Sequence, residues 1–261
     1  MKKVLFLLIG FHFVYATLAQ KSKESKNKGK VTYLVVTDFK HKDTSQAPKI
    51  TNMNATEAQL YFNEYESVFI IGENTPTQEV KGKDRNGNEI TTNLKLGSKE
   101  GFKFYKNLKN NQLISTEAIF DKVFVILDTL KGISWNINFD KVKQIGNLTC
   151  TEATANYRGR KYTAWFTTQI PISQGPWKLY GLPGLILEAY DSTRQVNFFF
   201  KNLSLEEKNI TEKLIPPPTK NVISFQEYKK RLIKKLKEFE RSMQEQNRTG
   251  TVEIGTIEPL N

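Results

Sequence analysis

Cysteine and histidine are scarce in this chain of 261 residues, which contains one cysteine and two histidines. A single thiol excludes an internal disulfide, so a packed core has to hold the fold together. Ser-His-Asp, Cys-His and zinc centres need residues that the sequence barely supplies. The HExxH, P-loop and GxGxxG motifs are also missing. We therefore expect no catalytic residues, no metal site and no cofactor.

Long apolar runs are confined to the beginning of the chain. Two lysines precede an apolar run over 4–13, and Thr17 and Ala19 provide the small residues of a cleavage site. This order predicts a signal peptide over 1–19, and the run is too short for a membrane anchor. No later stretch approaches ~18 apolar residues, so we expect no transmembrane segment in the mature chain. The expected location is the periplasm, the outer-membrane surface or the external medium.

Acidic residues are outnumbered, and the formal net charge is +12. Removal of the signal peptide would leave about +10, because it takes two lysines away. The basic residues are scattered and form no arginine-rich block, which indicates a solvated basic surface and no nucleic-acid partner. An anionic lipid surface is the specific use of this charge that fits an exported protein best.

Short segments of alternating polarity dominate the middle of the chain. A polar, lysine-rich stretch over 20–29 predicts a disordered leader. Closely spaced apolar-alternating segments over 30–215 predict one antiparallel β domain, with a hairpin that joins 78–82 to 89–96. The predicted fold class is mainly β with minor α: a curved antiparallel sheet, or a partly open barrel, with a C-terminal amphipathic helix.

Three strand patterns carry specific expectations. Residues 122–127 are apolar on both faces, so we expect that strand to lie deep in the sheet. The large side chains at 135, 137 and 139 alternate with asparagines and are expected to point inward. The segment 148–157 changes parity, and a bulge near Thr151-Glu152 would restore one inward face. Cys150 lies in this segment and is expected to be buried and structural.

The pattern changes after residue 215. Three consecutive prolines mark a linker over 216–223. A capping-box spacing from Ser224 to Glu227 and apolar residues at helical intervals predict a helix over 224–246, amphipathic over 225–245. We expect this helix to pack on the β domain, with contact to a membrane surface as the alternative. Residues 247–261 are expected to form a loose tail.

Between these regions, three strings follow one another in order: RKYTAWFT over 160–167, ISQGP at the end of 170–176, and GLPGLI over 181–186. Together they resemble the GLPGLI family of exported proteins of gram-negative bacteria. The resemblance covers most of residues 30–245 and is most specific over 135–190. It implies kinship and export, but the family has no established activity that could be transferred to this chain.

The glycines and prolines of these strings indicate a shaped loop over 168–184 that enters the core by a rigid turn. The residues of this structural motif are Gly175, Pro176, Gly181, Leu182, Pro183, Gly184, Leu185 and Ile186. One interpretation is a binding loop with Trp177 and Tyr180 as its contact surface. The other is a plug that closes one end of the sheet, and the excess of apolar residues favours it.

The candidate binding residues come from the same region: Arg158, Arg160, Trp165, Trp177 and Tyr180. An arginine beside strand aromatics either pairs with a carboxylate of the protein, such as Glu152 or Glu188, or holds an anionic ligand. Sequence alone leaves both alternatives open.

Three functions are compatible with this sequence. The first is a noncatalytic binding or carrier protein of the cell envelope, for an apolar or amphipathic ligand held in a curved sheet. The second is an accessory protein that docks on an outer-membrane protein through the helix over 225–245 and the loop over 168–184. The third is a hydrolase that uses a carboxylate pair, because Asp and Glu are plentiful.

Overall fold

The computed structural model describes residues 28–39, 45–46, 48, 55–72, 77–83, 89–95, 100–119, 122–205, 209–245 and 258. The predicted signal peptide lies outside the described residues, as do the predicted leader up to residue 27 and the predicted tail apart from Glu258.

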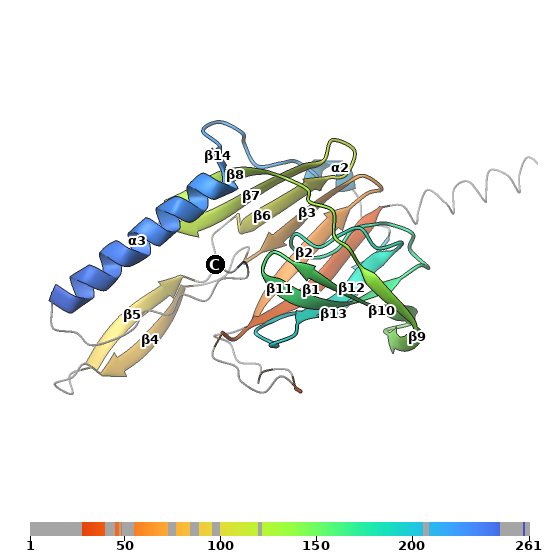
Figure 1. Cartoon of the computed structure of the whole chain (residues 1–261), viewed down its shortest axis with the longest axis horizontal. Coiled ribbons are helices and arrows are strands. Elements are labelled where there is room, and N and C mark those ends of the chain that lie inside the picture. The colour runs from red at the N-terminus through yellow and green to blue at the C-terminus, as the bar shows by residue number, and fades with distance from the viewer. Residues whose placement is uncertain are drawn as a thin grey trace, which may run out of the picture.

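Strands dominate the described chain, and one long helix follows them (Figure 1). The elements are β1 (Gly29–Thr37), β2 (Ala55–Phe62), β3 (Glu66–Ile71), β4 (Thr77–Lys83), β5 (Glu89–Lys95), β6 (Phe102–Asn107), β7 (Gln112–Ile119), β8 (Lys122–Thr129), β9 (Asn136–Ile145), β10 (Leu148–Tyr157), β11 (Arg160–Thr167), β12 (Leu185–Asp191), β13 (Val196–Ser204), α2 (Ile210–Lys213), β14 (Ile223–Ser224) and α3 (Phe225–Glu245).

Twelve of the strands form one sheet in the order β14-β8-β7-β6-β3-β2-β1-β13-β12-β11-β10-β9. The pairs are antiparallel except that β14 runs parallel to β8, and β4 pairs with β5 as the predicted hairpin, in a small sheet of their own. The sheet stays open, with β14 and β9 at its two edges. The predicted fold class is therefore confirmed: mainly β, antiparallel in nearly all pairs, open, with a C-terminal helix.

The large sheet curls on itself and encloses its main core. Phe69 on β3 and Phe198 on β13 have ring centroids 6.1 Å apart, although two strands separate them in the sheet. Only a strongly twisted sheet brings such side chains together. The loop over 168–184 fills the inside of this curl, since Ile170, Trp177 and Leu182 all belong to the same buried cluster. The loop thus has the position of a plug.

Polar anchors hold this loop in the core. Lys106 on β6 is fully buried and donates hydrogen bonds from Nζ to the carbonyls of Gly175 and Leu179, both at 2.7 Å. Ser67 on β3 donates from Oγ to Oε1 of Gln174 at 2.7 Å. These bonds satisfy carbonyl and amide oxygens that the loop carries away from water. They fix the loop to the strands on the far side of the curl.

The irregularity predicted near Thr151-Glu152 occurs at that position, but the extra residues lie on the neighbouring strand. The register between β9 and β10 shifts between Thr151 and Glu152, which confirms the predicted position. The extra residues lie on β9, since Thr151 faces Val142 and Glu152 faces Asn138. This insertion turns Phe139 outward, where it is 75% exposed, so the prediction that it points inward was wrong. The side chains at 135 and 137 do pack against the core.

The prediction that residues 122–127 lie deep in the sheet was also wrong. They form β8, next to the edge strand β14, and Val123 and Leu127 are 53% and 41% exposed. Phe124 and Ile126, on one face of β8, pack against α3, whereas Val123 and Leu127, on the other face, are largely uncovered. A continuous apolar run was therefore a sign of helix packing on one face rather than of a central strand.

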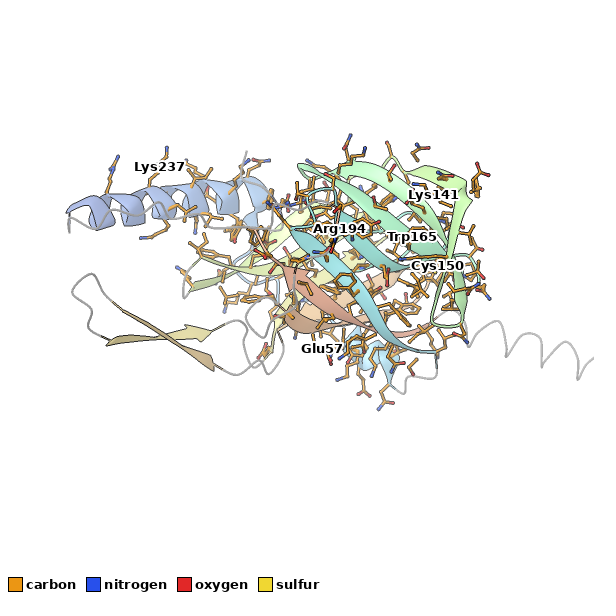
Figure 2. All side chains as sticks on the ribbon, turned by 90° about the horizontal axis from the view of Figure 1, so that it is seen from below. Glu57, Lys141, Cys150, Trp165, Arg194 and Lys237 are labelled. Carbon is orange, nitrogen blue, oxygen red and sulfur yellow. The ribbon has the colours of Figure 1, made fainter. Side chains whose placement is uncertain are left out.

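The helix α3 packs on the sheet through its first half. Ser224 Oγ accepts a hydrogen bond from the Glu227 amide at 3.2 Å, as the capping spacing predicted. Tyr228 and Leu232 are buried against Ile119 and Ile126. The second half projects away from the strands, as the position of Lys237 in Figure 2 shows.

Gly184 allows the close approach that seats the plug. A Cβ at this position would lie 2.1 Å from the carbonyl oxygen of Thr167 and 2.6 Å from its carbonyl carbon. Because both are backbone atoms, relief requires the strand itself to move. We predict that Gly184→Ala lowers the free energy of unfolding by about 3 kcal/mol. Gly132→Ala is the control, since its Cβ would meet nothing within 4 Å, and urea denaturation of both variants measures the difference.

Burial lowers the pKa of Lys106 well below its ordinary value of 10.5. Between the lowered pKa and 10.5 the unfolded chain binds a proton that the folded chain does not, so stability rises with pH there. We predict that Lys106 contributes up to about 1.4 kcal/mol per pH unit to this rise. Lys106→Met should reduce the slope of unfolding free energy against pH up to about pH 9.5, whereas the exposed control Lys109→Met should keep it. Equal slopes in all three proteins would contradict this role.

Candidate functional site

Two buried cations, Arg158 and Lys178, lie together, one in a hairpin turn and one in the loop over 168–184. Arg158 occupies the turn between β10 and β11, where Arg158 and Gly159 have φ values of 47° and 79°. Two consecutive residues with positive φ form the tight hairpin turn that suits the twist of the strands. Lys178 belongs to the plug and follows Trp177, which also has a positive φ of 52°. The hairpin turn and the plug thus bring the two cations to one place.

Arg158 is held by three groups. Its guanidinium donates to Oδ2 of Asp128 at 2.7 Å and to Oε1 of Glu258 at 2.6 Å. Its Nε donates to the hydroxyl of Tyr157 at 2.9 Å. Burial alone would lower the pKa of Arg158, but Tyr157, Glu258 and Asp128 outweigh that effect and raise the pKa. The arginine therefore stays charged although its side chain is only 6% exposed.

Lys178 is more deeply buried, with 1% of its side chain exposed. Its Nζ lies 2.9 Å from Oε1 of Glu117 and 2.7 Å from Oε2 of Glu258. Burial opposes the ammonium form, but the two carboxylates prevail, and the pKa of Lys178 is raised. Its ammonium also lies 4.9 Å from the ring centre of Phe225, the first residue of α3. Phe225 covers Arg158 as well, at 5.6 Å.

The carboxylate of Glu258 bridges the two cations. One of its oxygens binds Arg158 and the other binds Lys178, so a residue 100 and 80 positions away in sequence completes the cluster. Charge-assisted hydrogen bonds of this kind are among the stronger polar interactions in proteins. We call the group of Arg158, Lys178, Glu117, Asp128 and Glu258 the cation cluster.

A hydroxyl without a partner belongs to Tyr162, which packs against Trp177, the residue before Lys178. Tyr162 is fully buried, and its OH makes no hydrogen bond in the structure. Its ring packs against Trp177 with centroids 6.2 Å apart. Burial is the main cause that raises the pKa of Tyr162, and the charges of Asp191 and Glu258 add to it. The hydroxyl is thus within electrostatic reach of Glu258, and it is a buried donor that nothing in the described protein uses.

The other candidate residues predicted from sequence lie elsewhere. Arg160 pairs with Asp191 at 2.8 Å and stacks over Phe39. Trp165 lies under the ammonium of Lys143, 4.5 Å from its ring centre. Tyr180 donates its hydroxyl to the carbonyl of Lys131, and burial raises its pKa to about 12. Of the predicted residues, the structure brings Arg158 and Trp177 to the cation cluster, and Trp177 is buried rather than a surface contact.

Both arginines pair with carboxylates of the protein, which was one of the two alternatives, but the partners are other residues than the suggested Glu152 and Glu188. In the described chain, Glu152 pairs with Lys141 and Glu188 pairs with Lys143. Sequence reasoning also missed Lys178, Glu117, Asp128 and Glu258. Only Lys178 carried a signal, because a lysine between Trp177 and Leu179 in an apolar loop has to be buried with its charge.

Reactive groups are few in the part of the chain that the structure describes. Cys150 is buried, and burial raises the pKa of its thiol to about 12, so it stays protonated at neutral pH. The search of the described residues finds no group of three or more His, Cys, Asp or Glu that would suit a metal ion. Among the same residues, no helix combines the length and the apolar character needed to cross a bilayer.

Comparison with known proteins finds a family that matches part of the chain, but it gives no activity. Residues 158–188, which contain both cations, match the family described as "Protein of unknown function (Porph_ging)". Two solved structures of PNGF-II, in the C2 and P21 space groups, have a similar fold, each with a TM-score of 0.51. They are 13% and 12% identical over 80% of this chain, so the likeness concerns the fold alone. This chain spans 33% and 34% of their length, and no curated protein matches it.

The buried ammonium of Lys178 should be essential to the stability of the cluster. Lys178→Met leaves the carboxylates of Glu117 and Glu258 without this cation in a site with little water. We predict that the free energy of unfolding falls by about 3 kcal/mol, measured by urea denaturation. Lys201→Met removes an exposed ion pair with Glu57 and should cost about 0.5 kcal/mol or less. Equal losses in the two variants would show that the buried cluster is no stronger than a surface pair.

Proposed function

We propose that this chain is an exported, noncatalytic binding protein of the cell envelope that holds an amphipathic ligand by its carboxylate. The observation that carries the proposal is the bridging of Arg158 and Lys178 by the carboxylate of Glu258. A protein that binds one carboxylate between two buried cations has the polar anchor that small-ligand and peptide sites use to fix orientation.

The surroundings of the two cations suit a ligand with an apolar body. The rings of Tyr157, Trp177 and Phe225 lie within 5.6 Å of Arg158 or Lys178. Aromatic faces next to a cation offer both apolar contact area and cation–π stabilisation. This combination supports the amphipathic ligand of the first function hypothesis, with the acid group at the cations.

Export and family membership are part of the proposal. They are supported by the tripartite start of the sequence over 1–19 and by the GLPGLI string over 181–186. The string lies inside the segment that matches the family of unknown function. We propose on these grounds that the chain is a member of the GLPGLI family and works in the periplasm, at the outer membrane or outside the cell.

The two alternative functions receive less support. Asp128 binds Arg158, Glu117 binds Lys178 and Glu258 binds both, so each carboxylate is engaged by a cation, which disfavours a hydrolase built on a carboxylate pair at this site. An accessory protein would have used the loop over 168–184 as a contact surface, but Trp177 and Leu182 of that loop are buried. Of the two contact surfaces that the accessory function would use, the projecting half of α3 is the one that stands away from the strands (Figure 2).

Binding of a monocarboxylate with an apolar chain tests the proposal. Glu258→Gln, in the chain from Gln20 to Asn261, removes the negative charge that pairs with Arg158 and Lys178. We predict that decanoate binds this variant at least about tenfold more tightly than it binds the unchanged protein, measured by calorimetry. Decanol is the matched control without a carboxylate, and it should bind both proteins equally weakly. Equal binding of decanoate and decanol by the variant would refute a carboxylate site.

A further inference from the structure

We infer that the ligand of the cation cluster is a peptide segment carrying a glutamate between apolar residues, and that Glu258 is an occupant supplied by the chain itself. This inference rests on the proposed function and specifies its ligand class.

The group that fills the site in the structure is the side chain of a peptide residue. The carboxylate between Arg158 and Lys178 belongs to a peptide residue, and it contacts the cations at 2.6 and 2.7 Å. The side chain of Glu258 is 11% exposed, so it is enclosed rather than laid on the surface. In the sequence Ile257 precedes it and Pro259 follows it.

The second argument is the charge of the site. Arg158 pairs with Asp128 and Lys178 pairs with Glu117, so these four side chains are balanced without Glu258. A ligand carboxylate adds one negative charge to these four side chains. A phosphate group would add nearly two charges at neutral pH, and excess charge in a site with little water is costly. The balance therefore favours a carboxylate over a phosphate.

The third argument is that the site is built for more than Glu258 uses. Both cations are at least nine-tenths buried with Glu258 in place. Tyr162, whose ring packs against Trp177 beside Lys178, has a fully buried hydroxyl without a hydrogen-bond partner. A buried donor without a partner costs free energy. A peptide ligand offers backbone carbonyls, which this hydroxyl is able to bind.

An occupant on the same chain competes strongly with a ligand in solution. Tethering gives such a group an effective concentration of roughly millimolar. A peptide with micromolar affinity for the empty site would therefore bind the unchanged protein hundreds of times more weakly, by order of magnitude. Loss of the Glu258 charge should release the site for binding in trans.

The test uses a fluorescein-labelled peptide with the sequence of residues 249–261, titrated into the chain from Gln20 to Asn261 and followed by fluorescence anisotropy. We expect the peptide to bind the Glu258→Gln protein at least about tenfold more tightly than the unchanged protein. A peptide with Glu258→Gln should lose at least about tenfold in affinity, whereas a matched peptide with Glu253→Gln should bind like the parent. A phosphoserine at position 258 of the peptide should also bind more weakly.

A protein with both Arg158→Lys and Glu258→Gln keeps the positive charge at position 158 but loses the planar guanidinium. It should bind the parent peptide at least about tenfold more weakly than the Glu258→Gln protein does. Circular dichroism of each variant verifies that it is folded. Equal binding of the glutamate and glutamine peptides would overturn the inference, as would no binding by the Glu258→Gln protein. If decanoate binds that protein and the peptide does not, the peptide inference fails and the proposed function stands. If neither binds, both fail.

Discussion

The loop over 168–184 lies inside the curl of the sheet, and the polar groups that it carries there need partners away from water. Lys106 and Ser67 supply them on one side, through two backbone carbonyls and the Gln174 amide oxygen. Lys178 is the opposite case, because the loop itself brings the charge and other segments have to neutralise it. Glu117 on β7 supplies a negative charge and Phe225 at the start of α3 covers the ammonium, so both elements meet this one constraint.

The cation cluster joins segments that are distant in sequence. β7 and β8 contribute a carboxylate each, the hairpin turn after β10 contributes Arg158, and the first residue of α3 covers both cations. Such a cluster contributes little stability when its charges are compared with well-packed apolar residues. Its value lies in specificity, because the buried charges accept only an arrangement in which every one has a partner. The proposed carboxylate ligand would rely on the same property.

Local patterns predicted the fold well, and long-range pairing limited the prediction of the site. Alternation, capping spacing and the parity change at Thr151-Glu152 each depend on residues close in sequence, and the structure contains all three features. Phe139 failed because parity cannot tell which of two paired strands carries the extra residues. Arg158 was predicted as a candidate, but its partners Asp128 and Glu258 lie 30 and 100 positions away. No spacing rule connects such residues before the fold is known.

The insertion on β9 affects more than the direction of Phe139. β9 is an edge of the large sheet, and a regular edge offers its unpaired backbone groups to strands of other molecules. Here the extra residues interrupt the ladder near the middle of the strand, and Lys141 and Lys143 lie beside the interruption. An irregular edge strand that carries lysines resists edge-to-edge pairing with the sheets of other molecules. The irregularity on β9 is thus of the kind that keeps an exposed sheet edge from pairing with the edges of other molecules.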